Sequence, residues 1–352
     1  MKKWLNLAFF LYLFVLAIEL IKRTSLLLAP DISRFLLDGM NPIKAIATGW
    51  FTTTIFQSSD AVGSVTAAFA GNNILELGTA VYILMGALIG TAITALLISI
   101  ITISQKRRDF RHGFEIGLSY SIYSIILILI VLFLEFTLGL YSKSAFFIAS
   151  LIGENISLGK IPDIIGTITN PIINILLENL NRFVLMALGF SILIFALRFM
   201  GKTVIKVFGG EEQIRGFINK HFSSKIKIYF LGVFLTAIVF SSSITISLLV
   251  PLAVSRIINL RKALPFIIGA NLGTTADVFL ASILIGNVSA LAVFLASFLF
   301  SITGALIFLP NTKLLWKLTK HISKKTIHVS RRKALYFLLA FMALPLLMIW
   351  IF

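Results

Sequence analysis

The chain has 352 residues, of which 58% are hydrophobic and only 13% are charged, and its mean hydropathy is +1.00. A water-soluble domain carries about 25% charged residues, so this composition excludes an ordinary soluble enzyme and a disordered chain. The formal charge of +17 comes mostly from Lys and Arg between apolar runs, which is typical of cytoplasmic loops, so no nucleic-acid partner is expected. The absence of Cys excludes disulfides, thiolate metal sites and thiol nucleophiles.

Seven apolar stretches are long enough to cross a bilayer core of about 30 Å. In chain order they cover residues 4–21, 80–103, 114–138, 183–201, 263–285, 290–309 and 334–352. The first follows two Lys residues and lacks a small-residue cleavage site, so it is predicted to be an uncleaved signal anchor of a multi-pass protein in the cell membrane. Two further segments, 41–71 and 225–256, are apolar at both ends but polar in the middle.

The two polar-centred segments belong to an internal repeat. Residues 53–94 align without a gap on residues 236–277, at a constant offset of 183. Small and hydroxyl residues are prominent among the identical pairs, which include Ser58 with Ser241. Two unrelated apolar helices would match chiefly at Leu, Ile and Val, so this pattern indicates a true repeat.

The distribution of Lys and Arg predicts the topology of these segments. If both turn back inside the bilayer and the N-terminus is cytoplasmic, 23 of the 31 Lys and Arg residues lie inside and seven outside. If both cross, the division is 16 to 14, which violates the positive-inside rule. Re-entrant hairpins also place the second repeat upside down relative to the first. The predicted fold is an all-α polytopic membrane protein with two inverted repeats, each holding a re-entrant helical hairpin, and about seven full spans.

This fold predicts four regions along the chain. Residues 1–113 form the first inverted repeat (hairpin 41–71), 114–182 a linking span and extracellular connector, 183–289 the second repeat (hairpin 225–256), and 290–352 the C-terminal spans with a basic cytoplasmic loop. Within that loop, residues 311–333 are predicted to be either a basic amphipathic helix on the inner leaflet or a solvated loop. The sequence leaves open whether 144–181 holds another helix and whether the chain forms a homo-oligomer.

Polar residues mark each predicted hairpin tip: Gln57, Ser58, Ser59 and Asp60 in the first, and Ser241, Ser242 and Ser243 in the second. The helix after each tip begins with unpaired N–H groups and a positive dipole end, which favour an anion. The alternative is that the hydroxyls bond back to their own helix. Their occurrence in register across the repeat favours a binding site.

Two glycine motifs, GALIGT at 86–91 and GANLGTT at 269–275, lie inside long apolar stretches. Their glycines permit close approach of another helix, which is the alternative to a binding role. Thr91, Asn271, Thr274 and Thr275 supply neutral oxygens of the kind that hard cations prefer. Asp60 and Asp277 are the acids at these polar centres, and an acid at such depth costs at least about 2.5 kcal/mol unless it is paired or wet. They are predicted to bind Na⁺ or to carry a proton, whereas Glu19, Glu135 and Arg198, nearer span ends, are predicted to be structural.

These motifs resemble the type II sodium/phosphate cotransporter family and its bacterial relatives. That family carries QSSS in each of two inverted repeats, followed by a G-A/S-N-I-G-T-type motif, and the order and spacing here match over most of the chain. The resemblance implies Na⁺-driven uptake of inorganic phosphate by a transporter, not an enzyme, with Na⁺ as coupling ion and no other cofactor. The predicted substrate-binding residues are Gln57, Ser58, Ser59, Ser241, Ser242, Ser243, Asn271 and Thr274, and the predicted cation-binding residues are Asp60, Thr91, Thr275 and Asp277.

The chain departs from the family pattern at three positions. Asp60 replaces the third Ser of the first motif, Phe240 stands where the second has Gln, and Leu88 stands where GALIGT should have Asn. A carboxylate near a phosphate site repels the anion unless it is protonated or covered by a cation. An H⁺-coupled transporter, a transporter of another oxyanion and a passive anion channel therefore remain alternatives. The PhoU-like domain of many bacterial relatives is not expected, since the last residues form a span.

Overall fold

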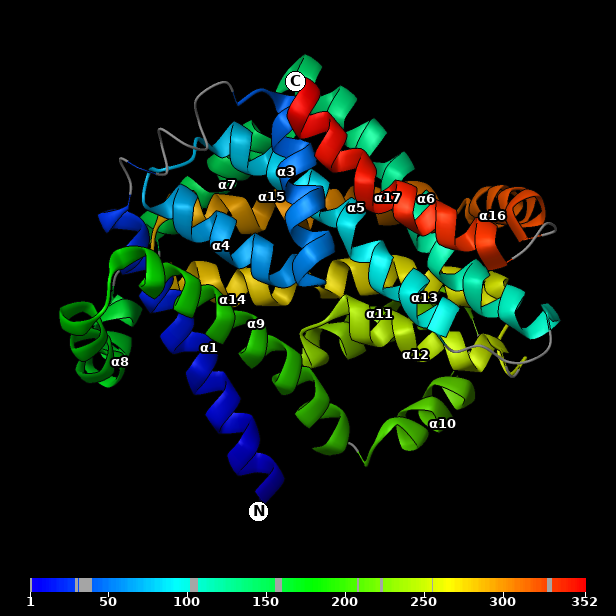
Figure 1. Ribbon diagram of the computed structural model, residues 1–352, viewed down its shortest axis with the longest axis horizontal. Helices are drawn as coiled ribbons and strands as arrows, with labels where there is room; N and C mark the ends of the chain where they lie inside the picture. The colour runs from blue at the N-terminus through cyan, green and yellow to red at the C-terminus, as the bar shows by residue number, and fades with distance from the viewer. Residues whose placement is uncertain are drawn as a thin grey trace.

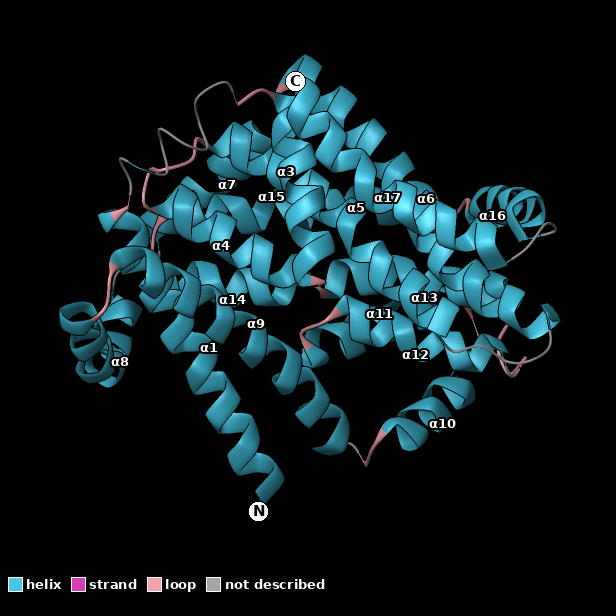
Figure 2. Ribbon diagram, in the orientation of Figure 1, coloured by secondary structure: helices cyan, strands magenta, loops and turns pink. Residues whose placement is uncertain are grey.

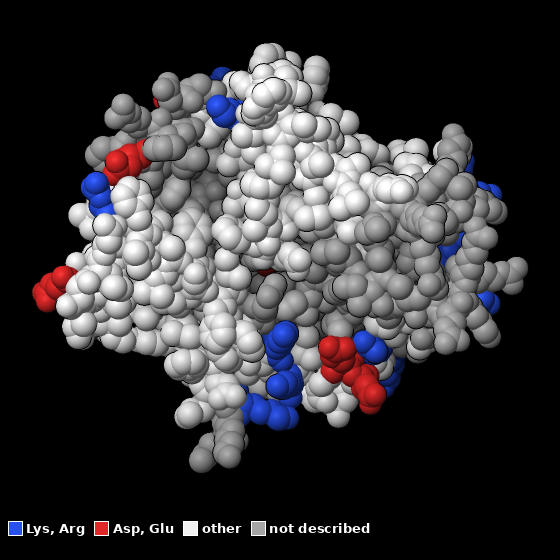
Figure 3. Space-filling model, viewed as in Figure 1, with Lys and Arg blue, Asp and Glu red and all other residues white. Residues whose placement is uncertain are grey.

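The computed structural model describes residues 2–28, 31, 40–101, 107–155, 160–207, 209–221, 224–254, 256–327 and 331–352. Every regular element in these ranges is a helix, so the all-α prediction is confirmed (Figure 2). Phe133, Phe136 and Trp350 are 67%, 76% and 86% exposed. Charged side chains gather toward the edges of the visible face, with a broad uncharged surface between them (Figure 3). Such an exterior is suited to lipid rather than water.

Within the described ranges, five helical stretches are long and apolar enough to cross a membrane (Figure 1). They lie in α1 (Lys2–Leu27), α6 (Arg107–Leu138), α9 (Arg182–Val207), the pair α13 (Leu260–Gly273) and α14 (Thr275–Ile285), and α15 (Val288–Phe308). The other two predicted spans form the apolar helices α5 (Leu77–Ile101) and α17 (Arg331–Ile351). Residues 102 and 103 of the predicted span 80–103 lie outside the described residues.

The predicted span 263–285 is a pair of helices rather than one. α13 ends at Gly273 and α14 begins at Thr275, with Thr274 as the junction. The equivalent part of α5 continues without a break. The second repeat reads Gly-Thr-Thr where the first reads Gly-Thr-Ala, and Thr has a lower helix propensity than Ala, which favours the break at this point.

Both polar-centred segments break directly before their serines, the first at Gln57 and the second at Phe240. Gln57 has φ 53° and Phe240 has φ 52°, so both adopt the left-handed conformation. The two residues are equivalent at the repeat offset of 183, and a left-handed residue with a side chain persists only where its surroundings hold it. The helices on either side are α3 (Pro42–Phe56) and α4 (Ser59–Gly71) in the first segment, and α11 (Lys225–Val239) and α12 (Ser242–Val254) in the second. Residue 255 of the predicted hairpin 225–256 lies outside the described residues.

The two breaks lie together at the centre of the molecule. From there α4 runs toward one end and α12 toward the opposite end (Figure 1). The side chain of Asn72, just after α4, donates to the carbonyl of Lys22 at 2.8 Å. The side chain of Asn287 donates to the carbonyl of Gly71 at 2.7 Å. The far end of α4 is thereby fixed beside the end of α1 and the start of α15.

Four helices complete the described chain: α7 (Leu140–Asn155), α8 (Lys160–Asn179), α10 (Glu211–His221) and α16 (Thr312–Ile327). α7 and α8 occupy most of the connector whose structure the sequence leaves open. α16 shows that the basic segment 311–333 is helical over most of its length, not an irregular loop. Residues 328–330 of that segment lie outside the described residues.

Glycines set the close packing of α3 on α5 and of α11 on α13. A Cβ on Gly86 would overlap the carbonyl oxygen of Ile46, and a Cβ on Gly269 would overlap the carbonyl oxygen of Tyr229. Gly86 and Gly269 are equivalent in the repeat, so each half contains the same close helix pair. Close helix packing, stated above as the alternative to a binding role for the two glycine motifs, therefore applies to these two glycines.

Glu135 fixes the start of α7. Its Oε2 accepts the backbone N–H of Tyr141 at 2.8 Å and that of Ser142 at 3.2 Å. The carboxylate thus satisfies two N–H groups in the first helical turn, and its negative charge lies at the positive end of the helix dipole. These contacts give Glu135 a structural role.

Replacing Glu135 with Ala is expected to lower the free energy of unfolding by about 1–2 kcal/mol, the size of a lost helix cap. Thermal unfolding of the purified protein in detergent would measure this loss. The ion dependence of transport should not change. A changed ion dependence with unchanged stability would contradict the structural role.

Candidate substrate and cation site

The tips of the two broken segments meet around one small cavity, called here the tip cavity. Its volume is about 80 Å³. It is lined by Phe56, Gln57, Ser58 and Asp60 from the first segment, Phe240, Ser241, Ser243 and Ile244 from the second, and Ile194 and Leu197 from α9. Polar residues separated by 183 positions in the sequence therefore form one wall, as the repeat predicts.

The serines at the tips also begin the helices that follow. Ser58 Oγ accepts the N–H of Ala61 at 3.1 Å, at the start of α4. Ser241 Oγ accepts the N–H of Ile244 at 3.3 Å, at the start of α12. Each bond satisfies one N–H of a first turn, and the helix dipole leaves positive potential at both ends. Two helix N-termini from opposite repeats therefore face the tip cavity, an arrangement that favours an anion.

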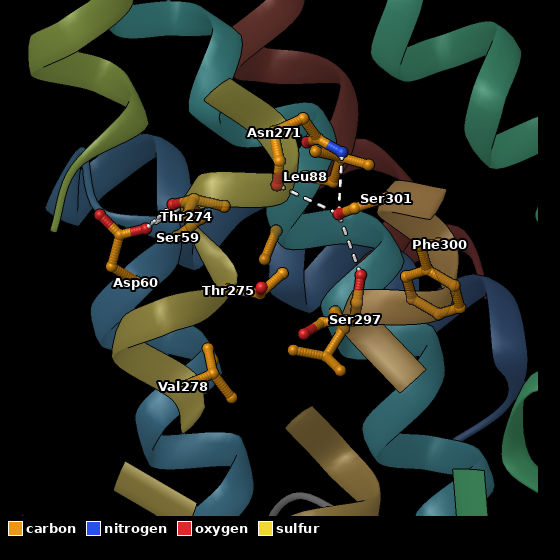
Figure 4. Close-up of a pocket in the computed structure, with 13 residues that line it drawn as sticks. Ser59, Asp60, Leu88, Asn271, Thr274, Thr275, Val278, Ser297, Phe300 and Ser301 are labelled. Atoms are coloured by element: carbon orange, nitrogen blue, oxygen red, sulfur yellow. Dashed lines mark hydrogen bonds between the residues drawn. The ribbon is translucent and has the colours of Figure 1, made fainter. Parts of the chain in front are cut away.

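A second cavity, called here the inner cavity, shares Asp60 with the first and has a volume of about 50 Å³ (Figure 4). Its polar lining is Ser59, Asp60, Asn271, Thr274, Thr275, Ser297 and Ser301, and its apolar lining is Gly63, Leu84, Ala87, Leu88, Val278 and Phe300. Seven side chains with oxygen atoms thus surround a space of a few atoms. Neutral oxygens around a carboxylate are a suitable set for a hard cation.

Asp60 connects the two cavities and the two repeats. Its side chain is buried, and the hydroxyl of Thr274 donates to its Oδ1. The hydroxyl of Ser59 donates to the same oxygen at 3.3 Å. Thr274 lies at the break between α13 and α14, so this bond ties the first tip directly to the glycine motif of the second repeat (Figure 4).

Asn271 is oriented by hydrogen bonds on one side only. Its Nδ2 donates to Ser301 Oγ at 3.1 Å (Figure 4) and to Tyr123 Oη at 3.3 Å, and Ser301 Oγ donates to the backbone carbonyl of Asn271 at 3.1 Å. Its buried Oδ1 has no hydrogen-bond partner among the described residues. A fixed, unsatisfied carbonyl oxygen in a polar cavity is available as a cation ligand.

Asp277 is fully buried in the first turn of α14. Among the described residues, neither of its carboxylate oxygens has a hydrogen-bond partner. An ionised carboxylate in that setting is costly, so the site favours a bound cation or a proton on Asp277. Asp277 itself lines neither cavity.

The structure brings nine of the twelve predicted site residues to the two cavities: Gln57, Ser58, Ser59, Asp60, Ser241, Ser243, Asn271, Thr274 and Thr275. Ser242, Thr91 and Asp277 line neither. The hydroxyl of Thr91 donates to the carbonyl of Ala87 in its own helix at 2.9 Å. The hydroxyl of Thr275, the first residue of α14, donates to the backbone carbonyl of Leu272 in α13 at 2.8 Å. The Thr275 side chain nevertheless lines the inner cavity.

Three polar residues of this region were not predicted from the sequence. Ser297 and Ser301 enter the inner cavity from α15, and Tyr123 reaches Asn271 from α6. The spacing of the two serines, four residues apart in an apolar span, places both on one helix face and was an available signal. Tyr123 carried no comparable signal, because single tyrosines are common in spans.

A family model described as Na+/Pi-cotransporter matches residues 13–153 and 167–314. The chain belongs to the Na⁺/Pi-cotransporter family. This is a family of membrane transporters rather than enzymes, so the resemblance stated from the motifs is confirmed. The match in two parts is the pattern expected of an internal repeat.

Several mammalian proteins are similar to this Na⁺/Pi-cotransporter family member. Sodium-dependent phosphate transport protein 2A is 24% identical in Ovis aries and 25% identical in Rattus norvegicus, each match covering 96% of the chain and 65% of the relative. Sodium-dependent phosphate transport protein 2C of Homo sapiens is 34% identical over 33% of the chain and 20% of the relative. The chain thus spans about 65% of the length of the 2A relatives. No solved structure matches it.

Proposed function

We propose that this Na⁺/Pi-cotransporter family member is a Na⁺-coupled symporter of inorganic phosphate that works by alternating access. The tip cavity is the observation that supports this most directly. Serines from both repeats and the N-termini of α4 and α12 face one space. A tetrahedral oxyanion accepts hydrogen bonds in every direction, and donors from two opposed tips suit it.

In this proposal the coupling Na⁺ occupies the inner cavity. Asp60 supplies the charge, and Asn271, Thr274, Thr275 and Ser301 supply neutral oxygens. Because Asp60 also lines the tip cavity, an empty cation site leaves a negative charge beside the anion site. Na⁺ at Asp60 cancels that repulsion, so phosphate binding follows Na⁺ binding. Asp277 then serves as a second cation or proton site.

We further propose that α3–α4 and α11–α12 are re-entrant hairpins of inverted repeats, with a cytoplasmic N-terminus. The bonds of Asn72 and Asn287 support this for the first hairpin. At the opposite end, Lys3 Nζ donates to the carbonyl of Lys206 at 2.9 Å, which joins the start of α1 to the end of α9. The excess of Lys and Arg on that side agrees with the positive-inside rule.

A larger cavity supports a route to the tip cavity from the outer side. It has a volume of about 600 Å³ and follows α9 from Phe183, near the start of that helix, to Ile194. Phe56 and Ile194 line both this cavity and the tip cavity. In the proposed topology the start of α9 is extracellular, so this arrangement corresponds to an outward-facing state.

Proton coupling is the second candidate, and Asp60 is the observation that favours it. This residue stands where the family pattern has the third Ser of QSSS. A protonated Asp60 would remove the repulsion of phosphate as well as Na⁺ does. A different oxyanion in the same cavity is the third candidate.

Uptake of radiolabelled phosphate into proteoliposomes tests these candidates. An imposed inward Na⁺ gradient is expected to drive accumulation above equilibrium, and Ser58→Ala is expected to lower it at least tenfold. The matched control is Thr137→Ala, because the exposed Thr137 hydroxyl donates only to the Phe133 carbonyl of its own helix at 2.7 Å.

The other outcomes separate the alternatives. Accumulation driven by an H⁺ gradient alone would identify a proton symporter. Flux that never exceeds equilibrium under either gradient would indicate a passive anion channel. No phosphate uptake by folded protein under any gradient would exclude phosphate as the substrate.

A further inference from the structure

The amphipathic helix α16 crosses one end of the helix bundle. Figure 1 views α16 nearly along its axis, whereas α13 and α15 run across the view. The helix therefore lies across the spans at the end where α13 begins and α15 ends. A helix in this position follows the plane of the membrane surface rather than crossing it.

One face of α16 is fixed to the bundle through polar contacts. Glu115 of α6 is 1% exposed, and its carboxylate pairs with Lys320 at 2.5 Å and accepts from Ser323 at 3.2 Å. The guanidinium of Arg261, at the start of α13, lies 4.2 Å from the ring centre of Trp316. These contacts fix which side of α16 faces the helix bundle. The other sides of the helix therefore face away from the bundle in fixed orientations.

A second face of α16 is basic. Lys313, Lys317 and Lys324 are exposed, and at about 100° per residue they lie on one stripe of the helix. Lys320 lies on the same stripe but its charge is paired with Glu115. The sequences of α13 and α16 contain no Asp or Glu, so no acidic residue of these two helices pairs with Lys313, Lys317 or Lys324. Lys and Arg atoms are visible at this edge of the molecule (Figure 3).

A third face of α16 is apolar and partly exposed. Leu314 is 50% exposed, and Leu318 and Ile322 are half-buried. By helical geometry this stripe borders the docked face on one side and the lysines on the other, and Leu314 neighbours Lys317. A helix with one docked, one apolar and one basic side has the form expected at the boundary between acyl chains and headgroups.

We propose that α16 binds the headgroups of anionic phospholipids, with Lys313, Lys317 and Lys324 as the contact residues. Charge complementarity supports this occupant, because each lysine near a membrane gains attraction to negative lipid, and the exposed leucine reaches the acyl region beside it. The proposal does not rest on the transported substrate.

Helix α8 provides an internal comparison. It is also amphipathic and lies at the opposite end of the molecule (Figure 1). Its sequence holds one Lys against one Asp and one Glu, so it has no basic face. A shape suited to the membrane surface therefore occurs at both ends, but the charge for anionic lipid occurs only on α16 of this pair.

Native mass spectrometry of the full-length protein in mixed micelles of phosphatidylglycerol and phosphatidylcholine tests the proposal. The wild type is expected to retain phosphatidylglycerol in preference, and the preference should weaken as salt rises. The triple variant Lys313→Gln, Lys317→Gln, Lys324→Gln should lose about tenfold to a hundredfold of it. A variant with Arg at the same three positions should retain the preference for phosphatidylglycerol.

A matched control removes three exposed lysines from other basic segments, as Lys220→Gln, Lys225→Gln, Lys227→Gln. This variant is expected to keep the preference. An equal loss in both triple variants, or no preference in the wild type, would overturn the proposal. If the Gln variant does not fold, the proposal is tested by the salt dependence of lipid binding in the wild type and the Arg variant. A preference for phosphatidylglycerol that does not change with salt would also overturn the proposal.

Discussion

Replacing Asp60 with Asn is expected to lower Na⁺-driven phosphate accumulation about tenfold or more and to raise the Na⁺ concentration needed for half-maximal uptake. Asn keeps the size of the side chain and an oxygen for the Thr274 hydroxyl but removes the charge that the cation needs. A tenfold loss corresponds to about 1.4 kcal/mol of cation binding, a modest value for a buried carboxylate. Uptake measured over a range of Na⁺ and phosphate concentrations separates the two ion dependences.

Asp60→Ser is the informative companion variant, because it restores the family's QSSS in the first repeat. It is expected to transport phosphate with an altered Na⁺ requirement, since the neutral hydroxyl no longer repels the anion. If Asp60→Asn leaves Na⁺ dependence unchanged but makes uptake independent of pH, Asp60 carries a proton rather than Na⁺. Unchanged uptake by both variants would remove Asp60 from the site.

Gly269→Val is expected to prevent accumulation of folded protein, or to destabilise it by about 3 kcal/mol or more. The added side chain meets the backbone carbonyl of Tyr229, and backbone moves only with the whole of α11. Because α11 also positions the second tip, any protein that does fold should show reduced uptake. Fluorescence-detected size-exclusion chromatography and thermal unfolding measure the effect.

Gly78→Ala is the matched control for this prediction. Gly78 lies in α5, and a Cβ there meets nothing within 4 Å. The substitution should leave stability unchanged or raise it by about 0.5–1 kcal/mol, because Ala is the better helix former. Gly269→Ala tests the steric argument at minimum size, and a stability equal to that of the control would contradict it.

The sequence by itself determined the helical class, the repeat and the positions of the two breaks. Serines at 58 and 241 recur in register because each break leaves free N–H groups at the start of a helix, and a hydroxyl oxygen satisfies one of them. The same logic located the glycine pairs, since a missing Cβ is needed wherever two backbones meet. These features depend on residues close together in the sequence, so the sequence alone is enough to predict them.

Only the tertiary structure decided which polar residues share a space. Thr91 and Thr274 are equivalent in the repeat, yet Thr274 bonds Asp60 and Thr91 bonds its own helix. Ser301 joins the inner cavity because α15 packs beside the glycine motif of the second repeat. The physical reason is that a repeat gives its two halves similar sequences, whereas the side chains around each copy come from other helices, such as α4 and α15 around Thr274 and Asn271, and differ between the halves.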